Sequence, residues 1–366
     1  MADYYFRLPQ ITELTIPQQA ALNETKQIAL SGGPGTGKSV VSLWRHISNY
    51  KQNKKSLLLT YATSLARYLK TCCASQSQEA ANNVGRSYKD KNRIHNGKWI
   101  EIIIDEAQDL SREYYDTVTG TKVSYGADDA QILYPDKSTT QTELKELFSD
   151  NIDYVLDKNF RSTQRIMQFA KTAFPNAYIP QSTIAGCKEV GELPVMLISS
   201  KNRWIEEKKA FEISNDKQNS AIINIIQQLT ADTHNIAILV PWKKDVIYFE
   251  QIIKDKTRDY SIYYEDDNVF PDGCGKIKNI HITTFKSAKG LEFDTVIIPN
   301  FDNILKKVPI KIKIKETEND QEVEKEKIMC SWNDLYVGVT RARNNLYLIS
   351  NYDMPQFNSI TDKSIL

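Results

Sequence analysis

Short apolar runs alternate with amphipathic stretches along the first part of the chain. Four runs predict buried strands, at residues 28–30, 56–59, 100–104 and 122–125. Stretches with the apolar spacing of helices separate or follow these runs, at residues 39–50, 64–69 and 142–148. Strands that alternate with helices in this way predict a parallel sheet covered by helices on both faces.

The same alternation starts again after residue 160. Strands are expected at residues 193–198, 236–240, 280–284, 295–298 and 346–350, and helices at 163–172, 221–229 and 243–254. Because domains usually run to about 100–200 residues, the pattern predicts two successive α/β units. We place the boundary near residues 151–157, which gives a first domain over 1–155 and a second over 156–366.

Each unit contains one segment that stands apart. Residues 71–99 leave room for a small helical insert in the first unit, and a charged insertion covers about 303–330 in the second. Residues 306–327 of that insertion read KKVPIKIKIKETENDQEVEKEK, basic with alternating isoleucines at first and mixed afterwards. A solvated hairpin or a loose insertion fits this pattern, and an arm that faces nucleic acid or a partner is the alternative.

Composition narrows the class of protein. The chain has 366 residues, 47 Lys and Arg against 46 Asp and Glu, and a formal net charge of +1. This balance excludes a binder that works by bulk positive charge but allows a local basic groove. No run of 18 apolar residues is present and the first residues lack a signal-peptide pattern, so we expect a cytoplasmic protein with no membrane partner.

The cysteines and histidines give no metal or disulfide signal. The five cysteines contain no C-x-x-C pair, and the four histidines have no metal-like spacing. We therefore expect reduced thiols and structural histidines.

A phosphate-binding loop is the first chemical motif. Residues 32–39 read GGPGTGKS, which satisfies G-x-x-x-x-G-K-[S/T] between a predicted strand and a predicted helix. Such a loop wraps phosphates with backbone N–H groups, and the helix N-terminus adds a partial positive charge. Lys38 is expected to reach the β and γ phosphates, and Ser39 to hold Mg²⁺. The expected nucleotide-binding residues of this loop are Gly32, Gly33, Gly35, Thr36, Gly37, Lys38 and Ser39.

An acidic pair follows a second predicted strand. Residues 102–109 read IIIDEAQD. Asp105 is expected to hold Mg²⁺ through water, and Glu106 to polarise the attacking water. Together with the loop, this pair predicts an NTPase that uses ATP and Mg²⁺, without saying what the NTPase moves.

Five further segments stand in a fixed order along the chain. They are LTIPQQ at 14–19, YGADDAQILY at 125–134, KNFRST at 158–163, TFKSAKGLEFD at 284–294 and LYVGVTRAR at 335–343. With IIIDEAQD, they resemble the ordered motifs of the UvrD/Rep-like superfamily 1 helicases. The implied roles are adenine reading for Gln18, adenine stacking for Phe160, γ-phosphate contacts for Gln131 and Arg161, ribose contacts and coupling to the DNA side for Gly290 and Glu292, and the arginine finger for Arg341.

The resemblance implies two tandem RecA-like P-loop domains with parallel sheets and ATP in the cleft between them. Lys38 and Glu106 belong to the first unit, whereas Arg161 and Arg341 belong to the second. If both halves complete one site, hydrolysis changes how strongly they attract each other and so opens and closes the cleft. The expected catalytic set is Lys38, Asp105, Glu106, Gln131, Arg161 and Arg341.

The chain also departs from this family's pattern. Full-size relatives carry large helical insertions, for which only residues 71–99 and 265–279 remain here. Lys286 replaces the histidine expected in the fifth motif, and Val40 stands where an arginine often follows the phosphate loop. These departures predict weak independent unwinding, because the missing subdomains grip and split duplex in relatives.

Contacts to a single strand are expected across the same edge of both units. The candidates are Thr60, Tyr61, Arg67, Trp242, Thr284 and Lys286. Tyr61 and Trp242 could stack bases, although packing in the core is the alternative for both.

We therefore expect ATP hydrolysis coupled to binding of, and translocation on, single-stranded nucleic acid, with DNA favoured. A 3′→5′ direction is implied by the resemblance only. The alternative is a nucleotide-gated sensor or regulatory ATPase subunit that acts with a partner nuclease, for example in anti-phage defence. No nuclease signature is present in the sequence itself.

Overall fold

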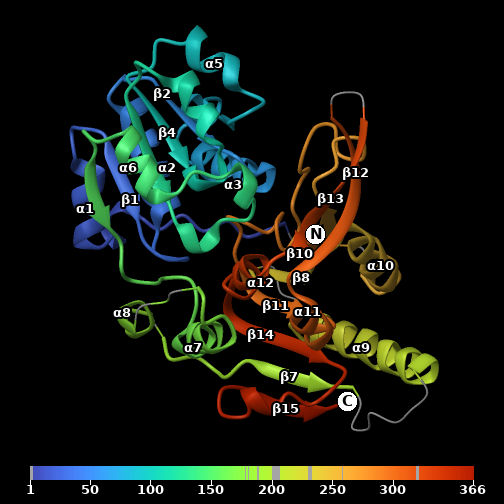
Figure 1. Cartoon of the computed structure of the whole chain (residues 1–366). Helices are drawn as coiled ribbons and strands as arrows, with labels where there is room; N and C mark the ends of the chain where they lie inside the picture. Colours follow the sequence, from blue (N-terminus) through green and yellow to red (C-terminus); the bar gives the residue numbers. More distant parts are fainter. Residues whose placement is uncertain are drawn as a thin grey trace.

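The computed structural model describes residues 3–366 except 178, 180, 188, 200–206, 230–232, 258 and 319–320. Figure 1 shows two lobes, one built from the blue and green part of the chain and one from the green-to-red part. Each lobe contains a sheet whose neighbouring strands all run parallel. The predicted fold class, tandem α/β domains with parallel sheets, is confirmed.

The first sheet has six strands in the order β3-β2-β4-β5-β1-β6. The strands are β1 (Ile28–Ser31), β2 (Ser56–Thr60), β3 (Val84–Arg86), β4 (Glu101–Asp105), β5 (Val123–Ala127) and β6 (Ile152–Val155). The helices are α1 (Ile16–Asn23), α2 (Lys38–Lys51), α3 (Thr63–Ala74), α4 (Gln78–Ala81), α5 (Lys91–Asn96) and α6 (Gln141–Leu147). All five residues of β2 and of β4 are buried, as continuous apolar runs in a sheet covered on both faces require.

The second sheet has seven strands in the order β15-β7-β14-β11-β8-β10-β9. The strands are β7 (Val195–Ile198), β8 (Ile236–Val240), β9 (Tyr260–Tyr263), β10 (Ile280–Thr284), β11 (Phe293–Ile298), β14 (Ala342–Ser350) and β15 (Asp362–Ile365). The helices are α7 (Gln164–Ala173), α8 (Gln181–Ala185), α9 (Glu207–Leu229), α10 (Lys243–Ile253), α11 (Phe301–Lys307) and α12 (Trp332–Val339).

The charged insertion contains an antiparallel ribbon. Strands β12 (Ile310–Glu318) and β13 (Gln321–Cys330) pair along their length. The ribbon projects away from the second sheet (Figure 1).

Several elements escaped the sequence pattern for physical reasons. Strand β3 has only three residues, and β6 and β15 are edge strands whose burial is partial. Short or half-exposed strands lack the continuous apolar run that marks a central strand. The predicted central strands and the helix after the phosphate loop are all present.

The start of the chain packs on the second lobe. Asp3 forms an isolated bridge with Lys278, and the Tyr4 backbone N–H donates to the Ile277 carbonyl at 3.0 Å. The N label in Figure 1 lies accordingly beside the second sheet. One apolar cluster contains Tyr4, Leu65 and Phe285, so packing is continuous between the lobes.

All five cysteines are buried free thiols. Within the described part of the chain, every helix is too short or too polar to cross a membrane.

Candidate nucleotide site between the two units

The phosphate loop connects β1 to α2. Gly32, Gly35 and Gly37 have φ angles of 142°, 73° and 91°, in the region that favours glycine. A Cβ atom at Gly35 would lie 2.5 Å from the Asn159 side-chain oxygen. Glycine is therefore needed where a loop from the other side of the cleft presses on the phosphate loop.

Lys38 opens α2 and folds back over the loop. Its Nζ donates to the carbonyls of Gly32, at 2.6 Å, and Gly33, at 3.1 Å. It also lies 3.9 Å from the Asp128 carboxylate. The buried ammonium is therefore placed at the centre of the loop that would receive phosphates.

The acidic pair lies at the end of β4, facing the phosphate loop. Burial and the adjacent Glu106 raise the pKa of Asp105. Burial also acts to raise the pKa of Glu106, but Lys289 and Lys38 outweigh it and hold that carboxylate ionised. Glu106 adopts a left-handed backbone conformation with φ of 56°, which turns the chain sharply at the end of the strand.

The donor set fits a divalent cation. Asp105 Oδ2 is buried and has no hydrogen-bond partner among the described residues, and the Ser39 hydroxyl stabilises the ionised carboxylate. A carboxylate and a hydroxyl beside phosphates are oxygen ligands of the kind that Mg²⁺ takes. Ser39 and Asp105 would hold the ion there.

Gln131 and Arg341 meet across the two units. Gln131 follows β5, and its amide donates to Asp128 at 2.6 Å. Arg341, just before β14 in the second unit, donates from Nη2 to the Gln131 side-chain oxygen at 2.9 Å. Burial and the nearby Arg161 lower the pKa of Arg341 to about 9. The predicted arginine finger thus reaches the first unit's site.

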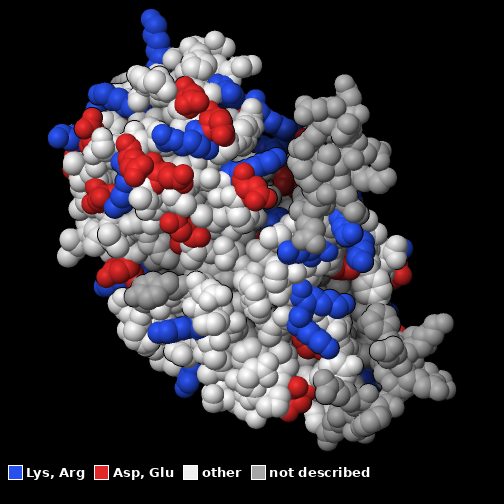
Figure 2. Space-filling view, in the orientation of Figure 1, with Lys and Arg blue, Asp and Glu red and all other residues white. Residues whose placement is uncertain are grey.

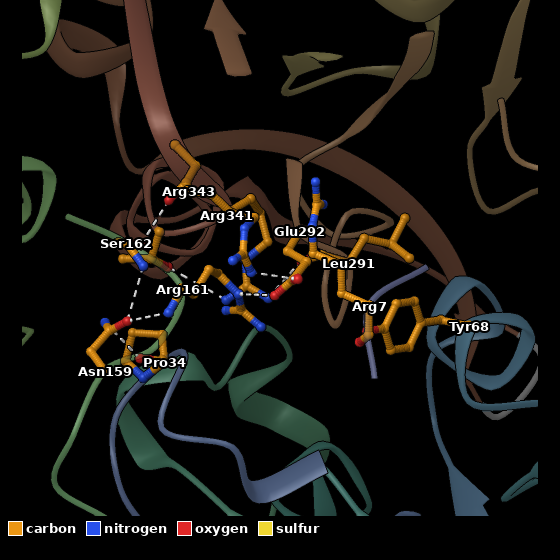
Figure 3. A network of polar contacts seen from close by, with 12 residues as sticks. Arg7, Pro34, Tyr68, Asn159, Arg161, Ser162, Leu291, Glu292, Arg341 and Arg343 are labelled. Atoms are coloured by element: carbon orange, nitrogen blue, oxygen red, sulfur yellow. Dashed lines mark hydrogen bonds and ion pairs between the residues drawn. The ribbon is translucent and has the colours of Figure 1, made fainter. Parts of the chain in front are cut away.

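The loop that contains Phe160 and Arg161 is fastened to the phosphate loop (Figure 3). Asn159 Nδ2 donates to the Pro34 carbonyl at 3.0 Å, and its Oδ1 accepts from the backbone N–H of Arg161 at 2.8 Å. The Phe160 N–H donates to Gly35 at 2.9 Å. Sequence reasoning quoted the segment around Asn159 but gave this residue no role.

Glu292 gathers two arginines at the domain-2 side of the cleft. It lies 3.3 Å from Arg161 and 2.7 Å from Arg343, so these cations and Arg7 lower its pKa despite complete burial. Figure 3 shows the three side chains pointing toward one another. Gly290, with φ of 81°, is pressed against Leu65 of α3.

Lys289 is a functional candidate that sequence reasoning missed. Its buried Nζ lies 2.7 Å from Asp109 and 3.4 Å from Glu106, and donates to the Gln131 carbonyl at 2.6 Å. A lysine of the second unit is therefore inserted among the acids of the first. Its position inside the segment TFKSAKGLEFD was the available signal.

A cavity of about 650 Å³ lies between the units at this place. Its lining includes Gln18, Gly35, Thr36, Gly37, Lys38, Ser39, Glu106, Gln131, Phe160, Arg161, Gly290, Glu292 and Arg343. Most of the predicted nucleotide-binding residues are thus brought together. The Gln18 side chain, expected to read adenine, contacts the Thr36 carbonyl at 2.9 Å and the Thr15 N–H at 2.9 Å.

The nucleic-acid candidates are distributed less evenly. Tyr61 and Lys286 line one shallow hollow between the units, where Lys286 lies 4.8 Å from the Tyr134 ring and 3.0 Å from Asp334. Thr284, which ends β10, bonds Ser287 of the same hollow at 3.0 Å. Thr60 is completely buried at the end of β2.

The other two candidates lie outside that hollow. Arg67 is exposed on α3. Trp242 precedes α10 and lines a separate depression of about 170 Å³. In Figure 2, blue and red side chains are mixed over the first unit, in keeping with the balanced charge of the chain.

Comparison with known proteins agrees with the second unit's architecture. Residues 260–353 match the UvrD-like helicase C-terminal domain. This match, which covers β9 to β14, confirms the resemblance to UvrD-like helicases. The domain includes the residues from Gly290 to Arg343 that face the cleft.

A relative is similar over more of the chain. It is the protein named "Putative ATP-dependent DNA helicase R568" of Acanthamoeba polyphaga mimivirus, 26% identical over 268 residues. The alignment covers 69% of this chain and 35% of the relative, so the chain spans about a third of the relative's length.

Two solved helicase structures are also similar. The PRRSV helicase is 12% identical, with 92% of this chain and 54% of that chain covered and a TM-score of 0.43. The arterivirus nonstructural protein 10 (helicase) is 14% identical, with 96% and 65% covered and a TM-score of 0.42.

Proposed function

We propose that this chain hydrolyses ATP in the cleft between its two units and couples hydrolysis to movement on single-stranded nucleic acid, with DNA favoured. The observation that carries this proposal is the meeting of Arg341 with Gln131 beside Lys38 and Glu106. Phosphoryl transfer requires cations around the γ phosphate and a residue that orients water. The cleft offers both only when the two units are together.

Each residue has a part in this proposal. Lys38 binds the phosphates, and Glu106, kept ionised by Lys289 and Lys38, accepts the proton of the attacking water. Arg161 and Arg341 offset the charge that develops on the γ phosphate. Mg²⁺, held by Ser39 and Asp105, supplies further charge neutralisation when bound.

The place for a single strand is supported by the topology. Tyr61 follows β2, Tyr263 ends β9, and Lys286 follows β10, so the hollow lies at the carboxyl ends of strands from both sheets. Ligands of open parallel sheets bind at these ends. Tyrosine faces can stack bases, and Lys286 can pair with a phosphate.

The decisive experiment is steady-state ATPase with and without single-stranded DNA or RNA at two salt concentrations. We expect stimulation by DNA that weakens at higher salt, because phosphate contacts release counterions. The Glu106→Gln variant should lose hydrolysis by at least about 100-fold while it retains ATP binding. Hydrolysis that neither nucleic acid changes would contradict the coupling, and full activity in Glu106→Gln would contradict the assigned base.

A further inference from the structure

Residues 3–9, here called the N-terminal strap, connect the two units outside all of the helicase-like motifs. On the second unit, Asn235 clamps the Tyr5 backbone, accepting from its N–H at 2.8 Å and donating to its carbonyl at 2.9 Å. On the first unit, the Tyr68 hydroxyl donates to the Arg7 carbonyl at 2.7 Å, and the Trp44 indole donates to Pro9 at 2.9 Å. The strap is therefore fixed at both ends.

The strap is also a wall of the nucleotide cavity. Its residues Tyr5, Phe6, Arg7, Leu8 and Pro9 all line that cavity. Apart from Arg7, they present apolar or aromatic surface. Such a wall suits a base and a sugar better than it suits phosphates, whose counter-charges are supplied elsewhere in the cleft.

Arg7 is the polar group of this wall. Its Nη2 donates to both carboxylate oxygens of Asp294, at 3.0 and 2.9 Å, and to the Thr233 carbonyl at 3.1 Å. Its guanidinium carbon lies 4.8 Å from the centre of the Tyr5 ring. Nη1 of the same guanidinium is buried and has no hydrogen-bond partner among the described residues.

An arginine in this state is suited to a neutral acceptor. Asp294 offsets its charge and fixes its plane, and the aromatic ring holds it from one side. What remains is an oriented N–H donor that a ligand in the cavity can satisfy. Phosphates are served by Lys38, Arg161 and Arg341, so the unused donor matches the ribose or base.

We propose that Arg7 is a nucleoside-binding residue, donating from Nη1 to an acceptor of the ribose or base of bound ATP. This inference rests on the proposed ATP site and deepens it. Because the strap is fastened to both units, a nucleoside held by Arg7 also holds the units together.

The test compares equilibrium binding of ATP and of inorganic tripolyphosphate, without nucleic acid, in the Glu106→Gln background. Arg7→Ala should weaken ATP binding at least tenfold and leave tripolyphosphate binding within twofold. Arg7→Lys should be intermediate for ATP, since it keeps a donor but loses the fixed plane. Thermal melting checks that each variant is folded, and Arg7→Lys replaces Arg7→Ala if the latter does not fold.

The matched control is Asn235→Ala, which loosens the strap on the second unit but leaves the Arg7 side chain in place. We expect it to weaken ATP binding less than threefold. Equal losses in Arg7→Ala and Asn235→Ala would reduce Arg7 to a fastening of the strap and overturn the proposal. Equal losses for ATP and tripolyphosphate would overturn it in favour of a phosphate contact.

The outcome separates this inference from the proposed function. Unchanged ATP binding in Arg7→Ala overturns the role of Arg7 alone. If the protein with native Arg7 binds neither ATP nor tripolyphosphate, the proposed ATP site itself fails.

Discussion

At the residue scale, the site is decided by charges brought close together in a buried place. Glu106 stays ionised although it is buried, because Lys289 and Lys38 lie near it, whereas burial and Glu106 itself raise the pKa of Asp105. Two adjacent carboxyl groups thus acquire different properties from their neighbours. Such a separation is typical of sites in which one acid serves a metal and the other serves a proton.

Arg341→Lys should slow hydrolysis with little effect on nucleotide binding. The arginine donates to Gln131 with a geometry that lysine cannot reproduce, and it would act mainly on charge that develops in the transition state. We expect kcat to fall by about 10³-fold or more, the range for loss of an arginine finger. Single-turnover ATPase and titration with ATP measure the two effects.

The control for that variant is Arg165→Ala, at an exposed arginine on α7. A loss of kcat shared equally by both variants would contradict a finger role for Arg341.

Lys289→Met should destabilise the fold. The substitution leaves Asp109 and Glu106 buried without their shared cation, and breaking such a pair costs about 3–5 kcal/mol. The measurement is the free energy of unfolding in urea. The double variant Lys289→Met/Asp109→Asn should regain part of the loss, because one unpaired charge has been removed. Simple additivity of the two single changes would contradict an ion pair that matters for stability.

At the element scale, the segment after β9 crosses between the units. Glu265 accepts from the Tyr134 hydroxyl at 3.3 Å and lies 3.9 Å from Arg86, and Asp267 lies 3.2 Å from Lys89. This is one of the two places where the helicase resemblance leads us to expect an insertion. The acids lie beside the hollow that we assign to a single strand.

The double variant Glu265→Gln/Asp267→Asn should bind single-stranded DNA more tightly. It removes two negative charges and releases the cations Arg86 and Lys89 for phosphates. We expect a several-fold gain at low salt that shrinks at higher salt, measured by fluorescence anisotropy. Glu146→Gln/Asp150→Asn, at exposed positions in and after α6, has the same charge change. An equal gain in this control would indicate only a general charge effect.

At the scale of the whole molecule, stability should depend on two buried histidines. Burial lowers the pKa of His46 to about 4 and that of His281 to about 4. In the unfolded chain these groups titrate near about 6.5, so the unfolded state takes up protons first as the pH falls. Stability is therefore complete above that pH and is lost progressively down to about pH 4, by up to about 1.4 kcal/mol per pH unit for each histidine.

Urea unfolding between pH 7 and pH 4.5 tests this dependence. The ring of His46 bonds Ser56 at 2.8 Å and the Ala80 carbonyl at 3.0 Å, so His46→Gln should lower stability at pH 7. It should also flatten the pH dependence, because one titrating group is gone. A slope identical to that of the unmodified protein would contradict the contribution of His46.

The sequence determined the architecture of both units and the chemical identity of most of the site. Central strands such as β4 are fully buried, so their apolar runs were visible along the chain, and the phosphate loop needs glycines and a lysine at fixed spacing. Edge strands such as β6 were missed, because a partly exposed strand carries a weaker pattern.

Only the tertiary structure decided how distant residues share the cleft. Lys289 enters the acids of the first unit, Asn159 fastens one loop to another, and Arg7 joins the cavity from the start of the chain. None of these contacts follows from local spacing, because each is set by how two separately folded sheets pack. Local pattern records what a segment buries, whereas a partner more than 100 residues away is selected by the packing of the whole molecule.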